Sequence, residues 1–141
     1  MIFRATVEIS CPPAEAFDVY LDVERWPEWT ASVTSAERLD GGPLRVGSRT
    51  RVRQPRLPAT VWTVTSLEPG REFTWEATGP GTRTVGRHSL HPADGGCLAV
   101  AELEQRGPLA PLVVALTRKL TERYLGMETR GLKERCERTT G

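Results

Sequence analysis

The amino-acid sequence predicts a single α+β domain in which a curved antiparallel sheet of about seven strands wraps around a long C-terminal helix. Residues 32–105 form β-type segments joined by short turns, which is typical of an antiparallel meander. Residues 109–138 carry apolar side chains at helical spacing. A sheet with one apolar face must be covered, and only this last segment is long enough to cover it. A sheet that curls around the helix can also enclose a pocket.

The N-terminal elements are expected to be a strand followed by two short helices. Residues 3–10 alternate between apolar and polar side chains, which is the period of a half-buried strand. The proline pair at 12–13 indicates the start of a helix. This helix should run to about Asp22 and bury Ala16, Phe17, Tyr20 and Leu21. Pro27 prevents one continuous helix, so a second short helix or turn should follow.

Six further strands and a final helix complete the expected order, because turn-forming Gly, Pro and Asp residues divide the chain at short intervals. The expected strands are Ser32–Asp40, Ser48–Gln54, Thr60–Glu68, Glu72–Thr78, Thr82–His91 and Cys97–Gln105. One helix should follow from about Leu109 to Arg138, weakened locally by Gly126 and Gly131. Its expected buried face comprises Leu109, Leu112, Val113, Leu116, Leu120, Tyr124, Met127, Leu132 and Cys136.

Length and composition fit one globular domain spanning residues 1–141, which is large enough to fold without disulfides or metal. The net charge of +1 provides no field that would attract nucleic acid or an anionic membrane. No apolar run approaches the roughly 18 residues of a membrane span. The three cysteines include no CxxC pair and the N-terminus has no targeting pattern, so reduced thiols and a cytoplasmic protein are expected.

Four stretches carry a resemblance to a known family. They are Ile9–Phe17, Asp22–Trp29, Leu90-His91-Pro92 with Gly95-Gly96, and Gly131–Arg135. The chain resembles the START-like (SRPBCC) superfamily, specifically the bacterial polyketide cyclase/dehydrase-type proteins. The resemblance spans essentially the whole chain and implies a helix-grip fold around a cavity for a small hydrophobic or aromatic ligand. The family holds cyclases, aromatases, hydrolase-like enzymes and carriers, so the fold alone does not decide the function.

Strand alternation predicts which side chains face the cavity. Pairing across the Pro69-Gly70 turn places Phe73, Trp75 and Ala77 on the same face as Trp62, Val64 and Ser66. The resemblance implies that the first and last strands are neighbours, which pairs Ile9 with Ala99, Val7 with Ala101 and Ala5 with Leu103. The strand at 82–91 should contribute Thr84, Gly86, His88 and Leu90 to the inner face.

The expected ligand-binding residues are mostly aromatic or small. They are Trp26, Trp29, Trp62, Val64, Phe73, Trp75, Gly86, Ala101, Leu103, Leu116 and Leu120. Two interpretations stay open for the large aromatic residues, because such side chains suit a filled core as well as a ligand wall. Trp26 and Trp29 can likewise form a lid at the pocket mouth or an apolar plug that joins their helix to the sheet.

Two polar residues are candidates for proton transfer. His88 is the only histidine expected inside, where it would act as a general acid or base or remain a structural, hydrogen-bonded residue. Tyr124 lies on the expected buried face of the last helix, and its hydroxyl would be a catalytic partner or a ligand contact. Arg49, Arg51 and Arg53 share one face of a strand. That face is either a solvated edge that resists aggregation or a site for an anion-carrying partner, such as a carrier-protein arm or an acidic ligand.

The sequence has no GxSxG, P-loop, GxGxxG or HExxH motif, and two histidines and three scattered cysteines do not predict a zinc site. Neither a metal nor a nucleotide cofactor is expected. One hypothesis is a cyclase or aromatase-like enzyme of the lyase or isomerase type acting on a polyketide. The alternative is a non-catalytic carrier or sensor of a hydrophobic molecule. A protein-interaction module is a third interpretation, and a monomer or homodimer is expected.

Overall fold

The computed structural model describes residues 1–140, with side chains described as far as Arg138. The elements follow in the order β1 (Ile2–Ile9), α1 (Pro13–Leu21), the 3-10 helix η1 (Val23–Glu28), β2 (Ser35–Arg38), β3 (Arg49–Arg53), β4 (Thr60–Glu68), β5 (Glu72–Gly79), β6 (Thr82–Ala93), β7 (Gly96–Arg106) and α2 (Ala110–Thr140). The proline-containing segment after α1 therefore forms a short second helix, as predicted.

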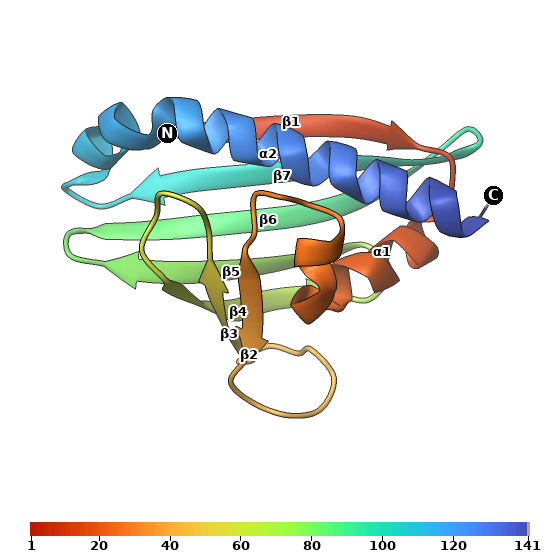
Figure 1. Ribbon diagram of the computed structural model, residues 1–141, viewed down its shortest axis with the longest axis horizontal. Coiled ribbons are helices and arrows are strands. Elements are labelled where there is room, and N and C mark those ends of the chain that lie inside the picture. The colour runs from red at the N-terminus through yellow and green to blue at the C-terminus, as the bar shows by residue number, and fades with distance from the viewer. Residues whose placement is uncertain (141) are drawn as a thin grey trace.

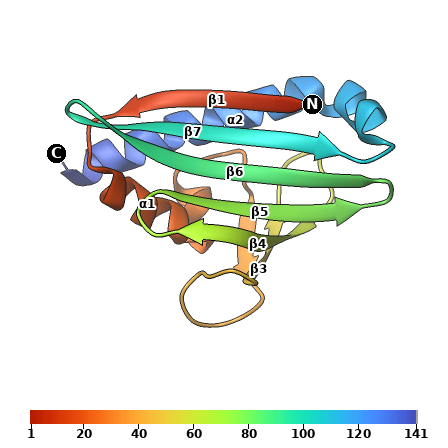
Figure 2. The same ribbon diagram turned by 180° about the vertical axis from the view of Figure 1, so that it is seen from behind.

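The seven strands form one antiparallel sheet in the order β1-β7-β6-β5-β4-β3-β2. α2 lies across one face of this sheet, and α1 and η1 lie beside the C-terminal half of α2 (Figure 1). No helix covers the opposite face in the described chain (Figure 2). The predicted fold class, the number of strands and the order of the elements are confirmed.

The register of two strand pairs differs from the prediction. A bulge between Val64 and Ser66 interrupts the pairing of β4 with β5, so Ser66 pairs with Thr74 and is exposed instead of facing inward. An extra residue in one strand reverses the faces beyond it, and sequence alternation alone does not reveal such a residue.

β1 pairs with β7 two residues away from the predicted register. Ile9 lies opposite Cys97, and Ala5 lies opposite Ala101. The end of β1 rests against Gly96, where an added Cβ would lie 1.9 Å from the Ile9 carbonyl oxygen, so this glycine permits the close approach. Because side chains in a strand alternate with a period of two, the shift leaves the same residues on the inner face.

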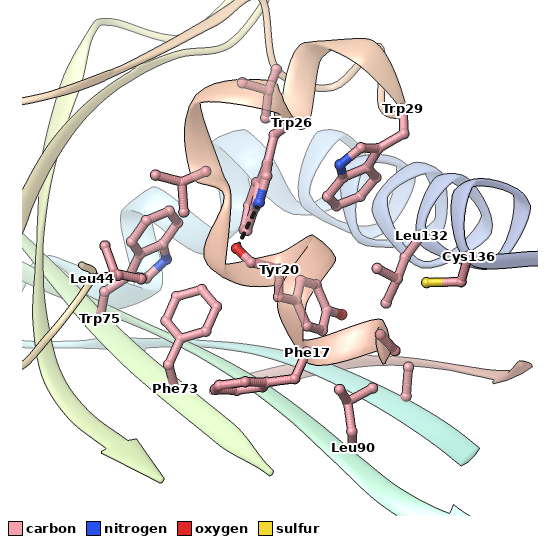
Figure 3. Packing of buried hydrophobic residues seen from close by; sticks show 14 of the residues in the cluster. Phe17, Tyr20, Trp26, Trp29, Leu44, Phe73, Trp75, Leu90, Leu132 and Cys136 are labelled. Carbon is pink, nitrogen blue, oxygen red and sulfur yellow. Dashed lines mark hydrogen bonds between the residues drawn. The ribbon is translucent and has the colours of Figure 1, made fainter. Parts of the chain in front are cut away.

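The apolar core lies between the C-terminal half of α2, the two short helices and the inner face of the sheet. Tyr20 and Phe73 pack edge to face with ring centroids 6.1 Å apart, and the Trp26 indole N–H donates to the Tyr20 carbonyl oxygen at 3.0 Å (Figure 3). Leu132 and Cys136 of α2 complete the cluster. The two short helices are therefore held to the sheet by aromatic packing.

The cysteines meet at the end of this core. The Cys11 thiol lies within hydrogen-bonding distance of both Cys97 and Cys136, and all three side chains are buried. Burial raises the pKa of each thiol, and it raises that of Cys97 to about 11. No group of three or more His, Cys, Asp or Glu side chains in the described residues is arranged to hold a metal ion.

Candidate functional site

A cavity of about 340 Å³ lies between the inner face of the sheet and α2. This volume is within the range of small-molecule sites. The sheet contributes Trp62, Trp75, Ala77, Gly86 and Leu103, and Trp26 of η1 closes the inner end. Gly86 leaves room for the Trp75 indole ring, because a Cβ at this position would lie only 3.0 Å from it.

The face of α2 that lines the cavity carries both apolar and polar side chains. The lining residues from this helix are Val113, Thr117, Thr121, Tyr124, Leu125 and Glu128. The prediction that Leu116 and Leu120 line the cavity is wrong, since neither contributes to the wall and Leu116 is 76% exposed. Both sets of residues have helical spacing, and an apolar pattern does not distinguish a solvent-facing leucine stripe from a wall that includes threonines.

His88 projects from β6 into the inner end of the cavity, as predicted from strand alternation. It is 5% exposed, and its ring stacks on Phe73 with centroids 4.4 Å apart. Its Nε2 lies 3.3 Å from Oε1 of Glu128, which is itself 8% exposed. Two ionisable side chains from opposite walls of the cavity thus come together in an otherwise aromatic environment.

The other polar atoms of this pair have no partner. Nδ1 of His88 and Oε2 of Glu128 are enclosed without a hydrogen bond to any described residue. Nε2 of His88 and Oε1 of Glu128 are the atoms that face each other. A ligand hydroxyl beside them can donate a hydrogen bond to an unprotonated Nε2 or to Oε1. Such a contact would offset part of the cost of burying the two groups.

The Tyr124 side chain faces the cavity, as predicted, but its hydroxyl is bonded within the chain. This hydroxyl donates a hydrogen bond to the Pro55 carbonyl oxygen, so it ties the loop between β3 and β4 to α2. Glu128, one helical turn further along the same face, stands next to His88 instead. The sequence contains this residue at the right spacing, but a charged residue in a helix is usually solvated, and apolar periodicity therefore does not reveal it.

The remaining predicted ligand contacts form the layer around the cavity. Val64, Phe73, Ala101 and Trp29 are buried but do not line the cavity wall. Trp29 packs against Trp26 with ring centroids 5.4 Å apart, and Trp26 is fixed by its hydrogen bond to Tyr20. These contacts favour the plug interpretation of the two tryptophans over a movable lid.

The convex face of the sheet carries ion pairs rather than a pocket. Glu102 pairs with Arg4, and Glu104 pairs with Arg87 at 2.9 Å. Hydrogen bonds from Arg106 and Arg87 lower the pKa of Glu104 to about 2. The contacts of Glu104 agree with the prediction that it faces outward, whereas Glu102 pairs with Arg4 and also contributes to the cavity wall.

A curved sheet that grips a long helix over an internal cavity defines a protein with the START-like fold. The chain matches the family described as polyketide cyclase/dehydrase and lipid transport over residues 1–137, and it belongs to that family. Comparison with curated proteins gave no match. None of the helices in the described chain combines the length and apolarity of a membrane-spanning helix.

Solved structures share the fold at low sequence identity. The protein TTHA0849 from Thermus thermophilus matches with a TM-score of 0.80 and 19% identity, covering 100% of both chains. A START superfamily protein from Mycobacterium smegmatis matches with a TM-score of 0.70 and 18% identity over 98% of both chains. The di-domain ARO/CYC StfQ from the steffimycin biosynthetic pathway matches with a TM-score of 0.76 and 14% identity. That match covers 99% of this chain and 51% of StfQ, so the chain spans about half its length.

Proposed function

We propose that this protein binds a small hydrophobic or aromatic molecule in the cavity and catalyses proton transfer on it, as required for polyketide-type cyclisation or dehydration. The observation that carries the proposal is the His88–Glu128 pair, whose nearest atoms lie 3.3 Å apart beside the aromatic rings of Phe73 and Trp75. A cavity that only separates apolar surfaces from water has no need for two buried ionisable groups, because their burial opposes folding.

The proposed chemistry needs one base and a shaped pocket. His88 Nε2 takes a proton from the carbon next to a ligand carbonyl, and the resulting enolate carbon forms a bond to a second carbonyl carbon of the same molecule. The new alkoxide then takes the proton back from Nε2. In the dehydration, Nε2 removes a second proton from the former enolate carbon. The hydroxyl group on the neighbouring carbon leaves as hydroxide and takes this proton from Nε2 to form water. The indole rings of Trp62 and Trp75 would hold the ligand in a reactive conformation.

Deuterium exchange at the α-carbon of an aromatic ketone such as 1-tetralone, followed by NMR in D₂O, tests the proton-transfer step. The wild-type protein should accelerate exchange over buffer, and H88Q should lower the rate by about 100-fold or more, which is a typical contribution of general acid–base catalysis. E128Q should retain ketone binding but lose part of the rate. Equal rates for wild type and H88Q would rule out the catalytic role of His88.

A carrier of a hydrophobic molecule is the second candidate. It is favoured by the position of Tyr124, because the hydroxyl expected to assist His88 is bonded to Pro55 and leaves a single acid–base pair in the described cavity wall. A carrier would bind the same ketone without accelerating exchange. The two functions therefore predict different rates of deuterium exchange and the same affinity for the ketone.

Ligand binding itself is tested by native mass spectrometry and tryptophan fluorescence with a panel of aromatic ketones and lipids. Thr121→Leu should weaken binding, because the larger side chain would occupy space in the cavity. Lys119→Leu, on the exposed side of the same helix, is the matched control and should leave binding unchanged. Equal affinities for the two variants would place the ligand outside the cavity.

A further inference from the structure

The outer face of β3 carries a concentration of arginines. Arg49, Arg51 and Arg53 alternate with Thr50 and Val52, which are 0% and 4% exposed on the inner face. Arg49 and Arg53 are exposed and Arg51 is half-buried. Arg56, in the loop that follows β3, is also exposed. These four residues are called the arginine cluster below.

Few carboxylates within the chain neutralise the arginine cluster. Arg51 pairs with Glu37 at 2.9 Å, and Asp40 is occupied by Arg38 and by the backbone N–H of Arg49. Within the described part of the chain, no carboxylate lies within ion-pair distance of the side chains of Arg49, Arg53 or Arg56. Residues 35–63 hold six arginines and two carboxylates, whereas the whole chain has a net charge of +1. The positive charge is therefore local, and the rest of the molecule is net negative.

Two residues of the arginine cluster are adjacent in sequence to residues that line the cavity. Arg53 directly precedes Gln54, and Arg56 directly precedes Leu57, and both of these neighbours line the cavity. Arg56 has a φ of 68°, in the left-handed region that costs a residue with a side chain conformational strain. The same loop is bonded to α2 through Tyr124 and Pro55. A molecule bound to the cluster would consequently lie close to the part of the cavity wall that Gln54 and Leu57 form.

We propose that the arginine cluster is a docking site for an acidic helical segment of a partner protein. Alternate residues of a strand are about 6.7 Å apart, and carboxylates at every fourth position of a helix are about 6 Å apart, so the two rows can pair. Arginine binds carboxylates through two parallel hydrogen bonds. A lipid surface fits less well, because membrane docking combines basic residues with several large inserted apolar ones. The exposed apolar side chains near these arginines are two valines, Val61 at 39% and Val46 at 59%.

The test uses a fluorescein-labelled alanine-based helical peptide with glutamate at every fourth position, measured by fluorescence anisotropy. Binding should weaken as salt is raised, since exposed charges are screened. R49E/R53E/R56E should weaken binding by about tenfold or more, as expected for several surface ion pairs turned into repulsion. R118E/K119E/R123E, on the exposed side of α2, makes the same change in total charge and should leave the affinity within about twofold.

Three results would overturn the proposal. These are equal weakening by both triple variants, absence of saturable peptide binding at low salt, and binding to phosphatidylglycerol vesicles without binding to the peptide. Circular dichroism and ketone binding show whether each variant is folded, and R49Q/R53Q replaces the triple variant if that one does not fold. If the wild-type protein does not bind the ketone, the proposed cavity function is contradicted, and the peptide result still stands.

Discussion

Replacing Gly131 with alanine should destabilise the protein, while the same replacement at Gly126 should stabilise it. Both glycines lie in the interior of α2. An added Cβ at Gly131 would lie 1.9 Å from the backbone oxygen of Trp29, so the C-cap residue of η1 packs directly on α2 at this glycine. At Gly126 the nearest atom is Nη1 of the flexible Arg130 side chain, at 3.8 Å. The two substitutions are chemically identical and differ only in their surroundings.

The expected magnitudes follow from these distances. Alanine is favoured over glycine in a helix interior by about 0.8–1 kcal/mol, so G126A should gain about that free energy of unfolding. G131A gains the same propensity, but its contact with backbone at 1.9 Å forces α2 away from η1. Overpacking of this kind costs up to about 3 kcal/mol, which leaves a net loss of about 2 kcal/mol. The two variants should therefore differ by about 3 kcal/mol.

Urea unfolding followed by tryptophan fluorescence measures both values. The two variants should have the same denaturant slope as the wild type, so that the midpoints report stability directly. Equal and positive changes for G126A and G131A would refute the close contact between Gly131 and Trp29, and with it the docking of η1 on α2.

Three further predictions concern the outer face, the cavity rim and the thiols. The folded-state pKa of Glu104 is lowered from 4.5 to about 2, so its stabilising contribution is present above pH 4.5 and lost as the pH falls toward 2. In urea unfolding, E104Q should therefore reduce the dependence of the free energy of unfolding on pH between 2 and 4.5. Y124F should cost about 0.5–1.5 kcal/mol in the same assay through loss of the bond to Pro55, and an unchanged midpoint would contradict that bond. The three thiols should react slowly with Ellman's reagent in the folded protein and rapidly in denaturant, whereas rapid reaction of Cys97 in the folded state would contradict its raised pKa.

Much of the fold could be predicted because local pattern and global packing agree. The alternation in residues 3–10, the proline pair at 12–13 and the turn residues after 32 each define an element boundary. The same alternation places His88 inward, since a strand has only two faces.

The errors arose where one pattern permits two structures. The bulge beside Ser66 changes the face without changing the composition. In α2, the leucines at 112 and 116 and the threonines at 117 and 121 each form a helical stripe, and the cavity rather than propensity decides which one faces inward. Glu128 was missed for the same reason, because its burial depends on His88 from a distant strand.

The imidazole signals of the two histidines provide the most direct test that His88 meets the ligand inside the cavity. His88 is buried beside Glu128, while His91 is exposed next to Ser89, and the chain has two histidines in total. With ¹⁵N-labelled histidine and H91Q to assign the signals, titration with 1-tetralone should shift the His88 nitrogens saturably and leave those of His91 unchanged. Unchanged His88 signals at ligand saturation would contradict binding beside His88.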